Sequence, residues 1–254
     1  MRLLREEENQ KKDQEMLYQL VFQHKDFLVI NKPAGLAVHP PENKFSKSPD
    51  FSGTLAGQLL KDFPQIINVG EKDFRPGIVH RLDKETSGLM LVALNQSSFI
   101  FFKSAFSQRK VEKKYWALVW GQPKREKGKI RSLIGRSRNC PTKQTAVFSP
   151  SKAKNPRPAE SDYFFCRNFG TFSLLEVIPK TGRKHQIRLH LHLLGVPIVG
   201  DKKYQTKALR EKNKLFSRHF LHAFSLRFIY VDGKEYFFCD SWPKDFRHLT
   251  GEDF

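Results

Sequence analysis

A chain of 254 residues, 39% of them hydrophobic, is long enough to bury a substantial core as one large or two small domains. Its 15 glycines and 14 prolines are too few for a collagen-like or low-complexity protein. Its apolar runs are far shorter than the about 20 residues that span a bilayer as a helix. The formal net charge of +19 favours a polyanionic partner, and nucleic acid comes before an anionic membrane surface.

The cysteines and the amino terminus indicate the compartment. Cys140, Cys166 and Cys239 are far apart and form no C-x-x-C pair, so neither a disulfide framework nor a thiolate zinc site is predicted. The first residues, MRLLREEENQKKDQEML, lack the apolar stretch of a secretory signal. We therefore expect a cytoplasmic protein.

The first half of the chain is predicted to be rich in strands. Residues 20–33 predict two short strands around a His-Lys-Asp turn, and residues 77–95 predict a strand, a polar loop and a second strand. Asn95 can cap a helix through residues 99–106. Residues 113–121 then form a strand with apolar side chains on both faces, which is typical of the centre of a sheet.

The second half predicts a hairpin and a helix. Residues 160–169 and 171–179 alternate like strands and are joined by a short Asn-Phe-Gly connection. Residues 183–195 place apolar side chains at the i, i+4, i+7 spacing of one helical face, and Gly195 is a natural end.

Two stretches rich in proline, serine and lysine, residues 39–52 and 149–158, are predicted to be surface loops. The chain has no internal repeat and no strict alternation of strands and helices. We therefore predict an α+β fold with a mixed, largely antiparallel central sheet flanked by helices and loops.

The positive charge is concentrated. Residues 103–143 hold 13 lysines or arginines against Glu112 and Glu126, and residues 202–218 hold seven against Glu211. Each basic side chain alone is best explained as solvated surface, but the clustering predicts a groove for a nucleic-acid backbone.

Several common kinds of site are missing. The chain contains no G-x-G-x-x-G, H-E-x-x-H or G-x-S-x-G. In residues 195–203, the nearest approach to a phosphate loop, Asp201 stands where lysine is needed, so we expect no nucleotide cofactor. His185, His190 and His192 do not share one helical face, so a helix flank or an RNA contact is predicted rather than a metal site.

A conspicuous polar loop, HRLDKETSGL at residues 80–89, lies between apolar segments. It can present the Asp83 carboxylate at the end of a rigid sheet, a common way to hold a reactive side chain. Alternatively, Asp83 and Thr86 only cap a turn. The loop alone does not decide between these interpretations.

This loop, together with KPAGLAVHP before it and TGRKHQIRLHLHLLGVPIVGDKKY after it, resembles the RluA family of RNA pseudouridine synthases. KKYWALVWG and FLHAFSL continue the resemblance in the order of the family, so it covers roughly residues 22–242. It implies the pseudouridine synthase catalytic fold and an isomerase that detaches a uracil, rotates it and rejoins it through carbon. It implies no cofactor.

The resemblance also assigns roles to individual residues. Asp83 is expected to be the essential catalytic residue, paired with Arg188, and Tyr115 is expected to stack on the base and take part in proton loss at carbon 5. Arg81 is expected to fill the RNA stack when the uridine flips out. Further substrate-binding candidates are Ile187 and Leu221 as an apolar floor, Arg183 and His80. Each also has a plainer explanation: an ion pair, a surface contact or core packing.

By this resemblance, residues 1–20 are an N-terminal extension and residues 21–254 the catalytic domain, with no amino-terminal S4 RNA-binding domain. We expect a monomer that acts on structured RNA, either tRNA or rRNA. One alternative is a noncatalytic RNA-binding or ribosome-assembly factor with the same fold. Another is glycosidic hydrolysis, which would require a second carboxylate opposite Asp83. Glu85 is close to Asp83 in sequence, but the motifs indicate no second acid.

Overall fold

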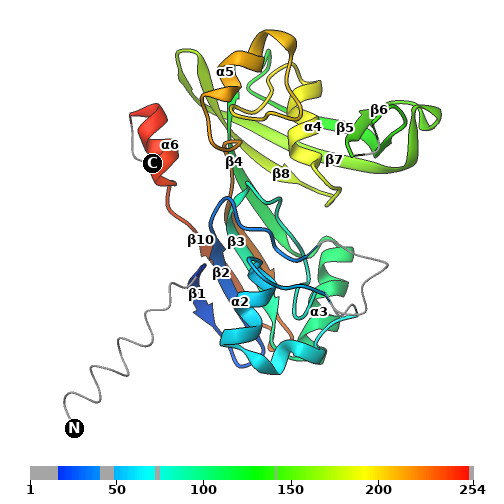
Figure 1. Cartoon of the computed structure of the whole chain (residues 1–254), viewed down its shortest axis with the longest axis vertical. Coiled ribbons are helices and arrows are strands. Elements are labelled where there is room, and N and C mark those ends of the chain that lie inside the picture. Colours follow the sequence, from blue (N-terminus) through cyan, green and yellow to red (C-terminus); the bar gives the residue numbers. More distant parts are fainter. Residues whose placement is uncertain (1–16, 41–48, 72–74, 141, 252–254) are drawn as a thin grey trace.

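The computed structural model describes residues 17–40, 49–71, 75–140 and 142–251 (Figure 1). Its strands are β1 (Gln19–Gln23), β2 (Phe27–Lys32), β3 (Ser87–Ala93), β4 (Glu112–Trp120), β5 (Lys127–Ser137), β6 (Gln144–Val147), β7 (Ala153–Phe169), β8 (Phe172–Pro179), β9 (Leu221–Ile229) and β10 (Glu235–Cys239). Its helices are α2 (Leu55–Asp62), α3 (Gln96–Ser107), α4 (Gln186–Leu193), α5 (Arg210–Lys214) and α6 (Lys244–Thr250), with short 3₁₀ turns η1 (Pro64–Asn68), η2 (Pro150–Lys152) and η3 (Lys207–Leu209).

The ten strands form one sheet in the order β1-β2-β3-β9-β4-β8-β7-β5-β6, and β10 pairs with β9. Within the described ranges, β3 and β9 pair in parallel and the other strand pairs are antiparallel. The predicted α+β fold with a mixed, largely antiparallel sheet is therefore confirmed.

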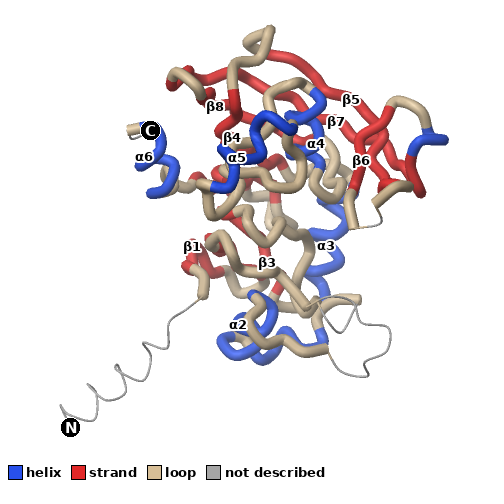
Figure 2. The backbone as a smooth tube through the Cα atoms, turned by 45° about the horizontal axis from the view of Figure 1, so that its top comes forward, coloured by secondary structure: helices blue, strands red, loops and turns tan. Residues whose placement is uncertain are grey.

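Strands β4 and β9 connect two halves of the molecule. The lower half in Figure 1 holds β1–β3, α2, α3 and β10, and the upper half holds β5–β8, α4 and α5. In the upper half, α4 packs against β5–β8 (Figure 2). Residues of the Asp83 loop (80–86) and of the start of α4 line one pocket, so the topology brings distant segments together.

Most elements predicted from the sequence are present. The strands β1 and β2, the central strand β4 and the β7–β8 hairpin all form where the patterns indicate. Helix α3 begins after Asn95, whose side chain accepts a hydrogen bond from the amide of Ser98 in a capping box. Helix α4 ends before Gly195, which has a φ of 87° and stops the helix as predicted.

Two local predictions are wrong. Residues 77–79 form no strand, because Gly77 has a φ of 67° and only Ile78 makes an isolated bridge, to Val92. Residues 149–158 are not a surface loop throughout: after η2, the chain enters β7 at Ala153 and pairs with β5. Pairing with a distant strand overrides the local proline and serine content there. For the predicted loop at 39–52, residues 41–48 lie outside the described ranges.

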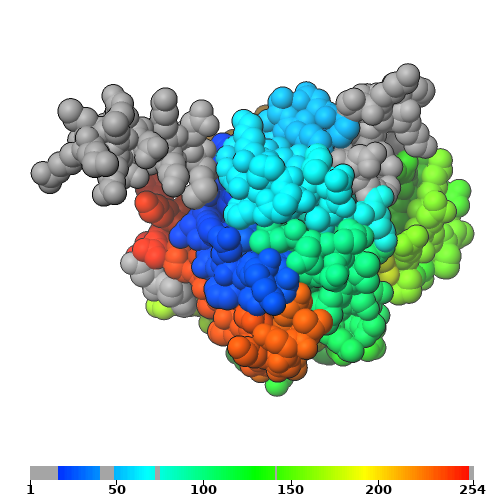
Figure 3. Space-filling view, turned by 90° about the horizontal axis from the view of Figure 1, so that it is seen from below, coloured from blue at the N-terminus to red at the C-terminus, as the bar shows by residue number. Residues whose placement is uncertain are grey.

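An aromatic cluster builds the core of the lower half. Phe27 packs against Phe102 of α3 and Phe228 of β9, with ring centroids 5.3 and 5.5 Å apart. Tyr230 and Tyr236 complete this cluster. Figure 3 shows the surfaces of β1–β2 (blue), α3 (green) and the β9–β10 hairpin (orange) side by side on this face. These contacts hold the strands that lead to the Asp83 loop.

Residues 17–40, 49–71, 75–140 and 142–251 were searched for membrane spans, metal sites and disulfides. No helix there combines the length and the hydropathy needed to cross a membrane. No group of three His, Cys, Asp or Glu side chains is arranged there to hold a metal ion. Cys140, Cys166 and Cys239 are free thiols.

Candidate active site

A buried lysine holds one side of the Asp83 loop, residues 80–86. Lys32, at the end of β2, is fully buried, and burial lowers its pKa to about 7. Its Nζ donates a hydrogen bond to the backbone oxygen of Lys84 at 3.1 Å, and the amide of Gly35 donates to the same oxygen at 2.9 Å. The middle of the loop is therefore tied to the end of β2.

Two buried histidines hold the other end of the loop. Thr86 Oγ1 lies 2.8 Å from His219 Nε2. Ser87 Oγ lies 2.9 Å from His222 Nδ1, where β3 and β9 pair in parallel. Gly88 has a φ of 115°, and a Cβ there would lie 2.3 Å from a backbone oxygen of β9, so only glycine permits this approach.

Arg188 of α4 lies between two carboxylates. Its Nη1 donates to Asp83 Oδ2 at 2.9 Å, while Nε and Nη2 donate to the two oxygens of Asp201 at 2.7 and 2.9 Å. Asp201 also accepts from the backbone amides of Lys203 and Tyr204 at 2.9 and 3.0 Å. The two hydrogen bonds from Arg188 to Asp201 fix the plane of the guanidinium group, so that the remaining Nη1–H points at Asp83.

The surroundings keep this pair charged. Burial disfavours the Asp83 anion, but its interactions with His185, and with the charge and hydrogen bond of Arg188, outweigh burial and hold the pKa of Asp83 below its ordinary value. Burial lowers the pKa of His185 to about 4, so Arg188 is the cation beside Asp83 at neutral pH. Burial also opposes the Arg188 cation, but the hydrogen bonds that it donates to Asp201 and the charges of the two carboxylates raise its pKa. At neutral pH, Asp83 is therefore an ionised carboxylate with a fixed orientation.

Tyr115 belongs to β4, between β8 and β9, and its side chain is only 8% exposed. Burial raises the pKa of its hydroxyl, and the negative charge of Asp83 raises it further. The phenol therefore stays protonated across the ordinary pH range. The side chain packs in the main hydrophobic core and also lines a pocket together with Asp83 and Arg188.

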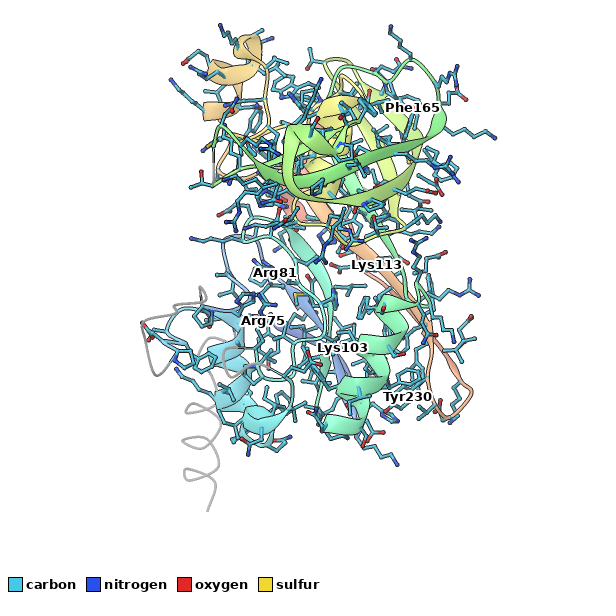
Figure 4. The ribbon with its side chains drawn as sticks, turned by 90° about the vertical axis from the view of Figure 1, so that its right-hand side faces the viewer. Arg75, Arg81, Lys103, Lys113, Phe165 and Tyr230 are labelled. Carbon is cyan, nitrogen blue, oxygen red and sulfur yellow. The ribbon has the colours of Figure 1, made fainter. Side chains whose placement is uncertain are left out.

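A pocket of about 670 Å³ opens where the two halves meet. All site residues predicted from the sequence line it: His80, Arg81, Asp83, Tyr115, Arg183, Ile187, Arg188 and Leu221. Its other cationic lining residues are Arg75, Arg109, Lys113, Lys180 and Lys184. Figure 4 shows Arg81 and Lys113 at the level of this junction. Two carboxylates, Asp83 and the exposed Glu112, also line it, but lysines and arginines outnumber them, which fits a phosphorylated ligand.

Arg81 and His80, both predicted to bind the substrate, lie in different surroundings: Arg81 at the mouth of the pocket and His80 in its wall. Arg81 is exposed, and its Nη1 lies 2.5 Å from His39 Nε2. The ring of His80 packs 4.6 Å from that of Phe106, and its Nε2 accepts the amide of Leu91 at 2.9 Å. Burial lowers the pKa of His80 to about 3, so it is a neutral imidazole already bonded to the sheet.

The loop before α4 is anchored by Gln186. Its Oε1 accepts the amide of Arg183 at 3.0 Å, and its Nε2 donates to Ser161 Oγ of β7 at 2.9 Å. His185 follows with a left-handed φ of 59° and brings its Nε2 to 3.8 Å from Asp83 Oδ1. The segment TGRKHQ is therefore a rigid rim of the pocket.

Sequence reasoning missed several of these residues. The sequence pattern marks Asp201 only as a carboxylate where a phosphate loop needs lysine, yet Asp201 is 1% exposed and binds Arg188. Two features could have identified Asp201: it lies in the segment GVPIVGDKKY, and a buried arginine needs an anionic partner. Lys32 likewise belongs to a quoted segment, KPAGLAVHP, but nothing in that segment indicates burial or a bond to Lys84. His219 has no signal in the sequence, because its contact with Thr86 links segments far apart in the chain.

The buried His219 makes a testable prediction about acid stability. Burial lowers its pKa to about 3. The unfolded state therefore binds more protons between pH 6.5 and 3, and stability falls as pH falls through that window. We expect His219→Gln to remove about 2 kcal/mol of the stability that wild type loses between pH 7.5 and 5.0, measured by urea unfolding. His248→Gln, at an exposed position of α6, is the control. An unchanged pH dependence in His219→Gln would contradict the buried neutral imidazole.

The comparisons with known proteins agree with this geometry. The sequence model of a family described as RNA pseudouridylate synthase matches residues 26–193. The chain is 36% identical over 205 residues to ribosomal large subunit pseudouridine synthase C of Rickettsia felis, covering 80% of this chain and 60% of that protein. It is 35% identical over 232 residues to ribosomal large subunit pseudouridine synthase D of Borreliella burgdorferi, covering 89% and 66%.

An uncharacterized RNA pseudouridine synthase of Chloroflexus aurantiacus is 42% identical over 193 residues, which cover 76% of this chain and 55% of that protein. The alignments thus span between 55% and 66% of the length of these relatives.

A solved structure supports the assignment of the fold. Human RNA Pseudouridylate Synthase Domain Containing 1 superposes with a TM-score of 0.71 at 28% identity, covering 93% of this chain and 87% of that one. The matched segments include HRLDKETSGL and the β4 strand that carries Tyr115. On these grounds, and as the HRLDKETSGL motif led us to expect, the chain belongs to the RNA pseudouridylate synthase family.

Proposed function

We propose that this protein is an isomerase that converts uridine to pseudouridine in a structured RNA, either tRNA or rRNA. The observation that carries the proposal is the Asp83 carboxylate, which is ionised and held by Arg188 inside a pocket of about 670 Å³. An anion kept in a fixed orientation and partly out of water is suited to act on a base or a sugar without a metal or an organic cofactor.

In the proposed reaction, the bond between uracil N1 and ribose C1′ breaks, and a bond between C5 and C1′ forms. The base loses a proton from C5 and gains one at N1, so no atoms enter or leave overall. We assign Asp83 to the reacting centre, with Arg188 as its counter-ion. The protonated phenol of Tyr115 can stack on the uracil, while Ile187 and Leu221, only 6% and 4% exposed, can form the apolar floor.

The substrate must leave the RNA stack to reach this pocket. Taking a base out of a stack costs a few kcal/mol, and a guanidinium group can fill the vacancy by stacking. Arg81 is exposed at the mouth of the pocket, which suits that role. Arg183, which also lines the pocket, is a candidate phosphate contact. In this proposal the protein acts as a monomer in the cytoplasm.

The proposal is tested with RNA that lacks the modification. The gene is deleted in its host, and total RNA is treated with a carbodiimide that marks pseudouridine, so that lost reverse-transcription stops are mapped. We expect at least one stop to vanish and to return when purified protein is added to the unmodified RNA. The position of that stop distinguishes tRNA from rRNA.

The competing interpretation, a noncatalytic RNA-binding or assembly factor, predicts another result. Purified protein would bind the unmodified RNA and form no carbodiimide-sensitive site in any tRNA or rRNA. That outcome would overturn the proposed activity, and family membership would stand.

A further inference from the structure

A second pocket, of about 460 Å³, adjoins the first on the upper half of the molecule. The two pockets share the rim residues 182–184. We call the second pocket the basic groove; it is lined by Ile134, Gly135, Arg136, Gln144, Lys154, Asn155, Arg157, Gly182, Arg183 and Lys184. Five of these residues are cationic and none is acidic. The groove therefore continues the active-site pocket along β5 and β7.

A β-bulge creates this arrangement. In β7, Lys154 pairs with Arg136 and Arg157 pairs with Ile134, so two residues of β7 stand opposite Gly135 alone. Residues three apart on a regular strand point to opposite faces. Because the bulge adds one residue to β7, Lys154 and Arg157 instead lie on the same face of the sheet, where both line the groove.

Glycine and a left-handed residue make the bulge possible. A Cβ at Gly135 would lie 2.6 Å from the backbone oxygen of Lys154 and 2.9 Å from Cα of Pro156. Asn155, inside the bulge, has a φ of 48°, which asparagine tolerates better than most residues. The local sequence is therefore suited to place two cations side by side.

The cations of the basic groove lack the ion pairs with carboxylates that other cations on the same sheet make in the described ranges. Lys129 and Arg131 of β5 pair with Glu160, and Lys180 pairs with Asp162. By contrast, no described carboxylate pairs with Arg136, Lys154, Arg157 or Lys184.

The groove cations also crowd one another. Burial lowers the pKa of Arg183, and the nearby charges of Arg157 and Arg109 lower it further. Cations gathered without counter-ions favour an anionic ligand, because its binding relieves their repulsion. The loop that joins the groove to the pocket is anchored by Gln186, so both sites keep a fixed relation.

We propose that the basic groove binds the phosphodiester backbone of the RNA strand on one side of the flipped uridine, with Lys154 and Arg157 as its principal contacts. This inference rests on the proposed function, because that function identifies the ligand as the RNA strand that carries the target uridine. Arg136 lies within the basic stretch 103–143, but the other four cations of the groove, Lys154, Arg157, Arg183 and Lys184, lie outside both basic stretches, 103–143 and 202–218.

The first experiment measures binding alone. The double variant Lys154→Gln/Arg157→Gln is compared with wild type for binding of a uridine dodecamer, followed by fluorescence anisotropy across a series of salt concentrations. Two lost phosphate contacts should reduce the slope of log K against log salt by about 1.4. The matched control is Lys61→Gln/Lys234→Gln, which removes the same charge from exposed positions on α2 and the β9–β10 turn. A double variant with the same slope as this control would overturn the inference.

The second experiment uses an RNA that the wild-type protein converts. We expect the Lys154→Gln/Arg157→Gln variant to raise KM about ten-fold and to change kcat by less than about two-fold, because the lost contacts are made equally in ground and transition states. With the RNA cut back to the target uridine and one nucleotide on each side, variant and wild type should have the same KM. An equal loss on long and short RNA, or a loss in kcat alone, would refute the groove.

The two proposals can fail separately. Wild-type protein that binds the dodecamer but forms no pseudouridine would overturn the activity, whereas the salt slope would still decide the groove. Urea unfolding of the double variant checks that it folds. Both substituted side chains are exposed, so we expect its stability to match that of wild type.

Discussion

Replacing Asp83 by asparagine is expected to reduce pseudouridine formation by more than about a thousand-fold while RNA affinity stays within a few-fold. The substitution keeps the shape of the side chain, and its amide oxygen can still accept the hydrogen bond from Arg188 Nη1. Arg188 also retains both bonds to Asp201, so the fold should persist. What disappears is the negative charge at the centre of the pocket. Single-turnover conversion, read by chromatography of digested RNA, and anisotropy measure the two quantities.

Glu85→Gln is the matched control for this experiment. It removes the same charge two residues along the same loop, but Glu85 does not line the pocket. We expect conversion by Glu85→Gln to stay close to wild type. If Asp83→Asn lowers RNA affinity as much as it lowers conversion, Asp83 has no chemical role. If Glu85→Gln also loses conversion, the reaction uses two acids.

The second large effect is expected at Asp201, which has no place in the proposed chemistry. Asp201→Asn should lower the free energy of unfolding by about 3 kcal/mol, because removing one partner of a buried ion pair leaves its cation poorly compensated. Asp201 is 1% exposed and Arg188 is 7% exposed, so water cannot replace the lost charge. Conversion should also fall, since Arg188 is no longer fixed toward Asp83. Urea unfolding and single-turnover rates at one pH measure both losses.

The chain offers a matched pair for comparison. Arg218 donates from Nε and Nη2 to the two oxygens of Asp245, at 2.5 and 2.8 Å, but the Asp245 side chain is 44% exposed. Asp245→Asn should therefore cost less than about 1 kcal/mol, because water solvates the exposed partner. Equal losses in Asp201→Asn and Asp245→Asn would show that burial does not set the strength of the Arg188 network.

The double variant Arg188→Met/Asp201→Asn separates stability from activity. It removes the buried cation together with the charge of its partner, so stability should recover relative to Asp201→Asn. Conversion should stay low, because Asp83 loses the cation that stabilises its charge. If conversion recovers along with stability, Arg188 holds the fold only, and the pairing with Asp83 has no chemical role.

Local patterns were sufficient for most of the secondary structure. Asn95 caps α3, Gly195 ends α4, and Gly170, with a φ of 73°, begins the two-residue turn between β7 and β8, all because these residues act on their nearest neighbours. Residues 149–158 contradict the local pattern because β5 supplies hydrogen-bond partners for the backbone from Ala153 onward. Composition carries no information about a partner strand that lies some 20 residues earlier in the sequence.

The sequence by itself determined the family, through the motif around Asp83, and the strongly basic character of the protein. Only the tertiary structure decided how the site is held. Asp201, His219 and Lys32 each act on a segment that the fold brings close, so their roles follow from the packing of β2, β3, β9 and α4. The same holds for the basic groove, since a single extra residue in β7 determines which face its cations occupy.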